Sequence, residues 1–353
     1  MKDELLNNLL TSDGISGYEE NVAKIITNYL SSICDNVVID NLGNVIGKIG
    51  TGKKKIMIIS HMDEIGMVVK YIDKNGYIYF IKIGGIDDSV LPGKMVKIIN
   101  KKGEHVTGII GTIPPHLAKD EKNNKSIKYT DMFIDIGIPS KTNVLKIIDI
   151  GDQIIFEPMA GILNGSFYYG KAVDNRIGCY TMIKIMEKLK KNKDLSSEIY
   201  ACATVQEEIG LKGAKTSSFK LNPDFVLVID TTISGDIPRI EEKTSILKLG
   251  KGTNITMIEA SGRGIIVNQK IHKLMVNIAY KNKIPYQIDI INAGITDGAI
   301  TYINRNGILT GILSIPVRYI HAPISVFNIN DVNSTISLGT KIIEKIIKNN
   351  VVF

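Results

Sequence analysis

The sequence predicts an α/β fold, in which helices flank a mostly parallel sheet, with an all-β domain inserted into it. After Gly165, strand and helix patterns alternate along the chain, which is typical of parallel sheets covered by helices on both faces. From Gly66 to Pro158, short runs rich in Ile and Val are separated by glycine-containing turns, and the pattern is almost purely that of strands. Strand patterns also precede Gly66, so the β-rich region interrupts one α/β domain.

The segment before the β-rich region is predicted to begin with helix. Residues 4–33 carry apolar side chains at helical spacing. Ser16 and Glu19 stand three residues apart, which is the spacing of a capping box, where both side chains bond to the backbone at a helix start. Three strand-like runs follow, at residues 36–40, 45–48 and 55–60.

The region after Gly165 is predicted to complete the α/β domain. Helices are expected at residues 176–191, 270–282, 297–304 and 332–348. Strands are expected at residues 199–205, 225–230 and 308–315. We therefore predict a discontinuous α/β domain of residues 1–65 and 165–353, and a β-barrel-like domain of residues 66–164 between its two parts.

Composition excludes several classes of protein. The chain has 353 residues, of which 44% are hydrophobic and 22% charged, so it has ample material for a folded core. The net charge of +7 comes from scattered lysines without an aromatic and basic stripe, which predicts no nucleic-acid partner. No apolar stretch reaches the roughly 20 residues of a membrane span. The acidic N-terminal residues lack the apolar core of a signal peptide, and the three widely spaced cysteines resemble reduced thiols. We expect a cytoplasmic protein without a membrane partner.

The pair Glu207–Glu208 directly follows an apolar run that reads as a buried strand. Two like charges at the mouth of a buried strand repel each other and lose hydration, so folding alone disfavours them. A bound cation would remove both costs. Taken in isolation, the pair is also compatible with a solvated helix start, where acidic residues suit the helix dipole. Matching ligands elsewhere decide between these interpretations.

Other candidate ligands stand where predicted strands end. His61 and Asp63 close one strand and share a face, so Asp63 could hold the ring nitrogen of His61 that faces away from a metal. Asp230 ends a fully apolar strand, where no structural role demands a carboxylate. Asp174 precedes a helix and could equally be its N-cap. His321 lies in a loop after the last strand. Open α/β sheets place their sites at such strand ends.

Together, two histidines and several carboxylates at the strand ends of one domain match the needs of a dinuclear metal centre. Imidazole and carboxylate ligands suit borderline divalent ions such as zinc or cobalt. Two ions roughly 3.5–4 Å apart would clamp an attacking water and an oxygen of the substrate. The sequence therefore favours a hydrolase with two metal ions.

The order and local sequence of these motifs resemble the tetrahedral (TET) aminopeptidases. This group of cocatalytic metallopeptidases, also called glutamyl aminopeptidases, was once mislabelled as endoglucanases. The matching stretches are Ser60–Gly66, Val173–Arg176, Val205–Gly210, Gly294–Ala299 and Arg318–Pro323. The resemblance covers essentially the whole chain, including the β-rich insertion.

The resemblance implies a set of metal ligands. Asp174 would bridge two divalent ions, with zinc or cobalt expected first and manganese as a further choice. His61 and Asp230 would complete one metal site. Glu208 and His321 would complete the other.

The resemblance also implies the chemistry and the assembly. Glu207 would be the general base, which deprotonates the bridging water and later protonates the leaving amine. Asp63 would orient His61. The substrates would be short peptides that bind by their free N-terminus, as in an aminopeptidase. The inserted domain would form dimers, and dimers would build a homo-oligomeric shell of twelve subunits.

The preferred N-terminal residue of the substrate is not predicted. The loops at residues 254–264 and 291–297 are candidates for lining its pocket. Arg239 and Arg263 lie in candidate loops and could bind an acidic side chain, although solvated arginines are the more common outcome.

Two other functions stay open at this point. A metal-independent glycoside hydrolase could use Glu207 and a second acid, but it would not need His61 or His321. Sugar sites also commonly stack on aromatic side chains, which are scarce here at 6%. A catalytically inactive scaffold with the same fold is the second alternative, and the complete ligand set argues against it.

Overall fold

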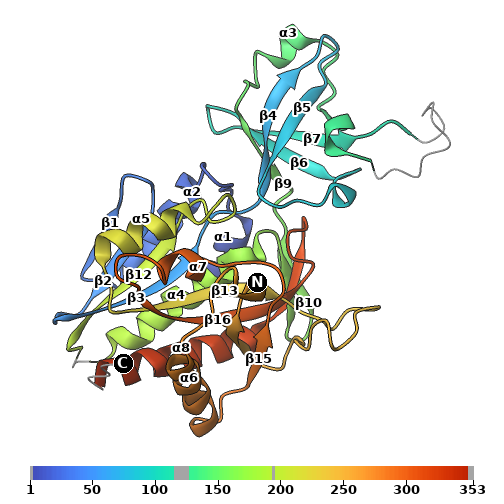
Figure 1. Cartoon of the computed structure of the whole chain (residues 1–353). Coiled ribbons are helices and arrows are strands. Elements are labelled where there is room, and N and C mark those ends of the chain that lie inside the picture. Colours follow the sequence, from blue (N-terminus) through green and yellow to red (C-terminus); the bar gives the residue numbers. More distant parts are fainter. Residues whose placement is uncertain (1–2, 115–126, 193–194, 349–353) are drawn as a thin grey trace.

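The computed structural model describes residues 3–114, 127–192 and 195–348, which form a large α/β domain and a smaller β-barrel (Figure 1). The barrel projects from one side of the α/β domain, and the strands of the large sheet run below it in the view of Figure 1. This arrangement confirms the predicted fold class. Among the described residues, no helix combines the length and the apolar composition needed to cross a membrane.

Four parallel strands form the centre of the large sheet, in the order β12, β3, β13 and β16. Their bounds are β3 (Lys54–His61), β12 (Ser197–Thr204), β13 (Phe225–Ile233) and β16 (Leu309–Arg318). These strands are near-continuous apolar runs that are buried almost throughout, as expected for strands covered on both faces. Because the four strands are parallel, their carboxyl ends lie at one edge of the sheet.

Antiparallel strands extend the sheet on both sides of this centre. One side carries β1 (Asn36–Ile39) and β2 (Val45–Ile49), and the other carries β17 (Ser325–Asn328), β11 (Phe167–Gly170) and β10 (Ala160–Asn164). Two further strands, β14 (Thr253–Ile258) and β15 (Tyr286–Ile290), branch from β16. The sheet is therefore mixed. The predicted parallel arrangement applies to its centre, because short connections such as that between β10 and β11 permit only antiparallel pairing.

Helices flank the sheet and bury its apolar side chains. Those of the α/β domain are α1 (Glu4–Thr11), α2 (Glu20–Ser31), α4 (Val173–Lys190), α5 (Lys212–Leu221), α6 (Gln269–Lys281), α7 (Gly298–Thr301) and α8 (Ile329–Lys348). Helix α8 packs against α4 and α6, and α4 also packs on β3 and β13. Helix α5 was not predicted, because its buried positions are Gly213, Ala214, Ser217 and Ser218 in place of large apolar residues.

The segment predicted to be helical, residues 4–33, forms two helices. These are α1 and α2, and residues 12–19 cross between them as an irregular segment. The predicted capping box is not what Ser16 and Glu19 form. The hydroxyl of Ser16 donates to Asp63, 47 residues away, and the carboxylate of Glu19 accepts from the backbone of Gly17 and Gln206. Each of these two side chains therefore has a partner far away in the sequence, Asp63 for Ser16 and Gln206 for Glu19.

The barrel is closed by six antiparallel strands in the order β4, β5, β8, β7, β6 and β9. Their bounds are β4 (Gly66–Ile72), β5 (Ile78–Ile83), β6 (Met95–Ile99), β7 (His105–Gly111), β8 (Phe133–Asp135) and β9 (Gln153–Phe156), with the short helix α3 (Lys141–Val144) beside them. The barrel has an apolar core of its own. Because β10 pairs with β11 in the large sheet, residues 160–164 lie outside the barrel, and the predicted boundary at residue 164 is too late.

Candidate metal centre

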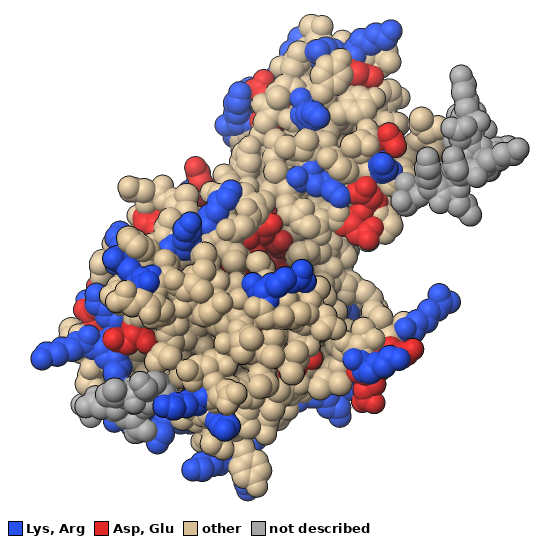
Figure 2. All heavy atoms as spheres, viewed as in Figure 1, with Lys and Arg blue, Asp and Glu red and all other residues tan. Residues whose placement is uncertain are grey.

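The candidate site lies at the carboxyl edge of the four parallel strands. His61 is the last residue of β3, and Asp230 lies in the second half of β13. Glu207 and Glu208 occupy the turn after β12, and His321 lies in the loop after β16. These four segments converge because parallel strands end at a common edge. Figure 2 shows acidic side chains recessed in a hollow between the barrel and the α/β domain.

The structure brings the five predicted metal ligands together as two overlapping groups. One group is His61, Asp174 and Asp230, and the other is Asp174, Glu208 and His321. In each group, the potential ligand atoms lie within 4.8 Å of one another. One oxygen of Asp174, Oδ1, lies 3.3 Å from Nε2 of His61, and the other, Oδ2, lies 3.3 Å from Nε2 of His321. Asp174 is thus shared between the groups.

These residues fit a pair of divalent ions. Oδ1 of Asp174 and Oε1 of Glu208 are buried and accept no hydrogen bond from any residue that the structure describes. A buried carboxylate oxygen without a donor is costly, and a cation would satisfy it. Imidazole nitrogens and carboxylate oxygens are also the ligands that zinc and similar ions take in catalytic sites.

Both histidines are oriented through their second ring nitrogen. Nδ1 of His61 lies 3.2 Å from the backbone oxygen of Asp63 and 3.4 Å from its carboxylate Oδ1. Nδ1 of His321 lies 3.0 Å from the backbone oxygen of Gly85, which follows strand β5 of the barrel domain. A ring nitrogen that donates to a carbonyl leaves Nε2 as the free ligand atom. The backbone oxygen of Asp63 is therefore within hydrogen-bond distance of the His61 ring, and the carboxylate of Asp63 lies slightly farther from the same ring nitrogen.

The carboxylate of Asp63 has a further set of partners. Its Oδ1 accepts the backbone N–H of Glu207 at 3.0 Å, and its Oδ2 accepts that of Glu208 at 3.2 Å. The hydroxyl of Ser16 donates to Oδ2 at 2.6 Å. Burial opposes ionisation of Asp63, but His61 and these donors hold its pKa below the usual value. Asp63 thus ties the end of β3 to the turn that carries both glutamates.

Asp174 is presented by the irregular start of α4. Asp174 and Asn175 depart from helical dihedral angles, so the chain turns before the regular helix begins. The side-chain amide of Asn175 donates to Ser60 Oγ at 3.0 Å and to the backbone oxygen of Ile229 at 2.9 Å. These bonds fix the start of α4 between β3 and β13, directly beside His61 and Asp230. Asp174 is therefore not a simple N-cap of the helix, which was the other interpretation of its position in the sequence.

Glu207 lies beside the ligand groups without joining either of them. Its side chain is 9% exposed, and its Oε2 is 3.9 Å from Nε2 of His61. Burial raises the pKa of Glu207 well above its usual value, against the opposing charge of His61, and the nearby carboxylate of Asp230 adds to the increase. A carboxyl group with a raised pKa is suited to accept a proton and to release it again.

The model of the M42 glutamyl aminopeptidase family matches residues 43–338 of the chain. The chain belongs to this family. A putative aminopeptidase of Acetivibrio thermocellus is 37% identical over 95% of this chain and 96% of its own length. Family membership and this relative support a hydrolase that acts on peptides, and they argue against the glycoside hydrolase alternative.

Solved structures show the same fold as this M42 chain. A TET aminopeptidase from a marine sediment archaeon of the Thaumarchaeota superposes with a TM-score of 0.93 at 33% identity, covering 97% of this chain and 95% of its own. The TET1 peptidase of Pyrococcus horikoshii, which can assemble into a tetrahedron or a large octahedral shell, has a TM-score of 0.85 at 32% identity. That comparison covers 96% of this chain and 98% of the TET1 chain.

A cavity of about 480 Å³ opens from the ligand groups of the M42 site. Its lining includes Glu259 and residues 291 and 293–296, so both loops that were predicted to line a pocket do so. Apolar side chains make up much of the remaining wall, among them Leu211, Ile233 and Ile320. Arg239 and Arg263 are exposed, and neither is among the described residues that line the cavity, so both are solvated arginines.

Two buried acids near the site were not singled out from the sequence. Asp297 accepts the hydroxyl of Thr204 at 2.5 Å, and burial raises its pKa to about 7. Glu259 is fully buried and accepts both the hydroxyl and the backbone N–H of Thr296, and burial raises its pKa to about 7 as well. Asp297 lies in one of the family-like stretches, which is the signal that could have found it. Glu259 follows a strand without such a signal.

A buried ion cluster stands behind the site. Nζ of Lys171 lies 2.5 and 2.6 Å from the two carboxylate oxygens of Glu64, and the guanidinium of Arg176 reaches Glu64 at 3.3 Å. All three side chains are buried. Because Glu64 follows Asp63, and Lys171 and Arg176 flank Asp174, the cluster joins two segments that carry site residues.

Proposed function

We propose that this M42 enzyme is a two-metal aminopeptidase that releases N-terminal residues from short peptides. The observation that carries the proposal is the position of Asp174, which directs one oxygen to each of two histidine and carboxylate groups. A carboxylate placed in this way is suited to bridge two ions. His61 and Asp230 would hold one ion, and Glu208 and His321 the other. Zinc or cobalt fits these ligands, and manganese is a further choice.

The chain supplies the groups for proton transfer and orientation. Two divalent ions would lower the pKa of a bound water and polarise the scissile carbonyl. Glu207 takes a proton from the attacking water and delivers it to the leaving amine. Its side chain stands next to His61 and outside both ligand groups, which leaves it free for this task. Asp63 fixes the orientation of the His61 ring and the position of the Glu207 backbone relative to each other.

We also propose a homo-oligomeric assembly through the barrel, as a dimer and then a shell of twelve subunits. The barrel exposes several large apolar side chains, including Tyr71, Met95, Ile109 and Ile150, and apolar surface of this kind commonly marks an interface. The assembly of the similar TET1 peptidase supports the shell. A shell would restrict substrates to short peptides. A cytoplasmic location belongs to the same proposal, because all three cysteines are free.

One experiment tests the proposed reaction. The protein is stripped with a chelator and assayed with zinc, cobalt or manganese on aminoacyl anilides and on matched substrates whose N-terminus is acetylated. We expect no activity in the metal-free protein, recovery with metal at about two ions per chain, and no cleavage of the blocked substrates. Full activity after metal removal would exclude the two-metal mechanism, and cleavage of blocked substrates would exclude an aminopeptidase.

A further inference from the structure

The turn that carries Glu207 and Glu208 is held by side chains from the N-terminal part of the chain. Each of the four consecutive backbone N–H groups of residues 205–208 donates to a side-chain oxygen. The pairs are Val205 N to Asn44 Oδ1 at 3.1 Å, Gln206 N to Glu19 Oε1 at 3.1 Å, Glu207 N to Asp63 Oδ1 at 3.0 Å, and Glu208 N to Asp63 Oδ2 at 3.2 Å. The turn is thus fixed at every residue.

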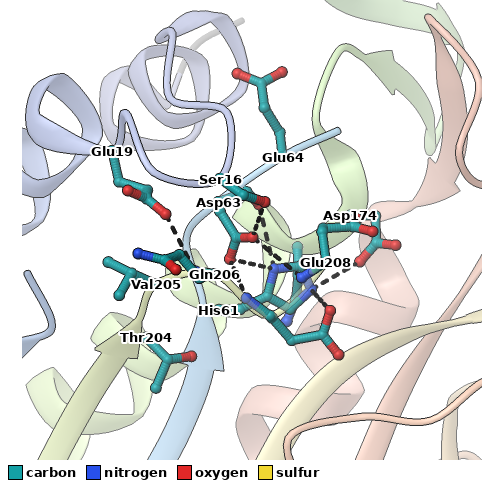
Figure 3. Close-up of polar contacts among 12 residues, drawn as sticks. Ser16, Glu19, His61, Asp63, Glu64, Asp174, Thr204, Val205, Gln206 and Glu208 are labelled. Carbon is teal, nitrogen blue, oxygen red and sulfur yellow. Dashed lines mark hydrogen bonds and ion pairs between the residues drawn. The ribbon is translucent and has the colours of Figure 1, made fainter. Parts of the chain in front are cut away.

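Two of these supports lead back to the irregular segment 12–19. Glu19 bonds directly to the turn, and its Oε1 also accepts the backbone N–H of Gly17 at 2.8 Å. Ser16 acts one step away, through its 2.6 Å bond to Asp63 (Figure 3). Ser16 is 3% exposed and Glu19 is 7% exposed, so both side chains are largely shielded from water.

We propose that Ser16 and Glu19 are positioning residues, which hold the backbone of the Glu207–Glu208 turn and so place the general base and one metal ligand. The inference rests on the proposed function, since it assumes those two roles for Glu207 and Glu208. Neither Ser16 nor Glu19 touches the potential ligand atoms, so each acts through Asp63 or through the backbone of the turn.

The cost of burying Glu19 supports a specific role. Burial raises the pKa of Glu19 to about 7, and the backbone N–H groups of Gly17 and Gln206 act in the opposite direction. Burying a carboxylate costs stability. The presence of a buried carboxylate here therefore indicates a role for the hydrogen bonds that it makes. Gln206 has a φ of +57°, a left-handed conformation that is unusual for a residue with a side chain, and its N–H is the group that Glu19 accepts.

The segment itself is anchored on two sides, which makes it a firm support. Backbone bonds join Ser16 and Gly14 to Glu64, directly after Asp63. Ile15 packs with Ile99 and Ile155 of the barrel domain. The hydroxyl of Tyr18 donates to the backbone oxygen of Gly151, also in the barrel domain, at 2.8 Å. The segment is wedged between the barrel and the site.

The test compares Glu19→Met, which removes the acceptor at similar length, with Glu19→Gln, which keeps an oxygen acceptor. We expect Glu19→Met to lower kcat by about 10–100-fold, the usual range for partners behind a metal ligand, with KM little changed. We expect Glu19→Gln to stay within about 3-fold of the parent enzyme, because it can accept the same bonds. Glu20→Met is the matched control, since Glu20 is exposed on α2.

A second readout does not depend on turnover. Each variant is titrated with zinc in competition with a chelator. Of the two zinc ions, the one that is bound less tightly is expected to bind about 10-fold more weakly to Glu19→Met than to the parent enzyme. Ser16→Ala is expected to shift kcat and zinc affinity in the same direction by a smaller factor, because Asp63 keeps its two backbone donors. Circular dichroism and thermal unfolding confirm that each variant is folded.

The outcomes separate this inference from the proposed function. Unchanged kcat and zinc affinity in Glu19→Met would overturn the positioning role, and so would a Glu19→Gln variant that loses as much as Glu19→Met. If Glu207→Gln is fully active, the role of Glu207 is wrong and the proposed function fails. An inactive Glu207→Gln together with a fully active Glu19→Met would overturn the inference alone.

Discussion

The two ligand groups share Asp174 but differ in how the fold holds them. His61 closes a central strand, its side chain is 2% exposed, and Nδ1 is held by Asp63, two residues away. His321 lies in a loop, its side chain is 38% exposed, and Nδ1 is held by Gly85, after strand β5 of the barrel domain. We call the group with His61 the closed group and the group with His321 the open group.

The difference has a cause in the backbone. The closed group rests on β3 and β13, which pair with each other in the middle of the sheet. The loop of the open group contains Tyr319 and His321 at φ values of +63° and +55°, which non-glycine residues adopt only where the surroundings hold them. A rigid, buried group suits permanent metal binding, and an accessible group suits contact with substrate. The candidate centre therefore combines a buried group with an accessible one around a shared carboxylate.

The largest effect is expected where the two groups meet. Asp174→Ala removes the shared carboxylate and leaves both histidines without their common partner. We expect loss of both ions and a fall in activity beyond the roughly 10⁴-fold that losing one proton-transfer group can cause. Elemental analysis and an anilide assay measure the two quantities. A folded variant that keeps two ions would contradict the shared role.

The next effect separates chemistry from metal binding. Glu207→Gln preserves the size of the side chain but removes its ability to accept a proton. We expect kcat to fall by about 10²–10⁴-fold while two ions remain bound. Glu208→Gln is the matched variant one residue away, and it should instead lose the ion of the open group. Equal metal loss in both variants would refute the division of roles between the two glutamates.

Stepwise metal removal tests the comparison between the groups directly. Because His321 is accessible and His61 is buried, a chelator should remove the ion of the open group first. We expect the two ions to differ by about 10-fold or more in affinity, a size typical of changes in the surroundings of metal ligands. His321→Ala should then bind a single ion, with the affinity of the tighter one in the parent protein. Removal of both ions in a single step would show that the two groups do not differ in how they hold metal.

The smallest effect concerns the contact between the open group and the barrel domain. A Cβ atom at Gly85 would lie 3.0 Å from Nδ1 of His321, which is tighter than normal packing allows. Gly85→Ala should therefore displace His321 slightly, because this side chain is partly exposed and can move. We expect a drop of about 2–5-fold in the affinity of the weaker ion, well below the cost of removing a supporting residue, and an unchanged tighter ion. A shift of the tighter ion instead would place the disturbance in the closed group.

Much of the fold could be predicted because its signals are local. The apolar runs that end at His61 and Asp230 identify strands, and the ends of parallel strands meet at one edge whatever their exact register. The positions of the candidate ligands follow from that rule. The antiparallel edges, the helix α5 with its small buried residues, and the end of the barrel at β9 could not be predicted, because they depend on which segments pair and pack.

The role of Asp63 shows the same limit within the site. Its place beside His61 follows from the alternation of side chains along a strand. Its bonds to Ser16 and to the backbone of Glu207 join residues that are 47 and 144 positions away, and spacing in the sequence carries no information about them. The Gly85 carbonyl that orients His321 is likewise 236 residues away.

Strand patterns and acids at strand ends are local features, so they predict the α/β class with its inserted β-rich region, the candidate ligands and the pair Glu207–Glu208. The three-dimensional structure was needed to show that one group is closed and the other open, that Asp174 faces both histidines, and that Ser16 and Glu19 bond to Asp63 and Gln206 in place of forming a helix cap. The physical reason is that hydrogen bonds and burial depend on distances in space, and a buried donor takes the best acceptor within reach, however far away it lies along the chain.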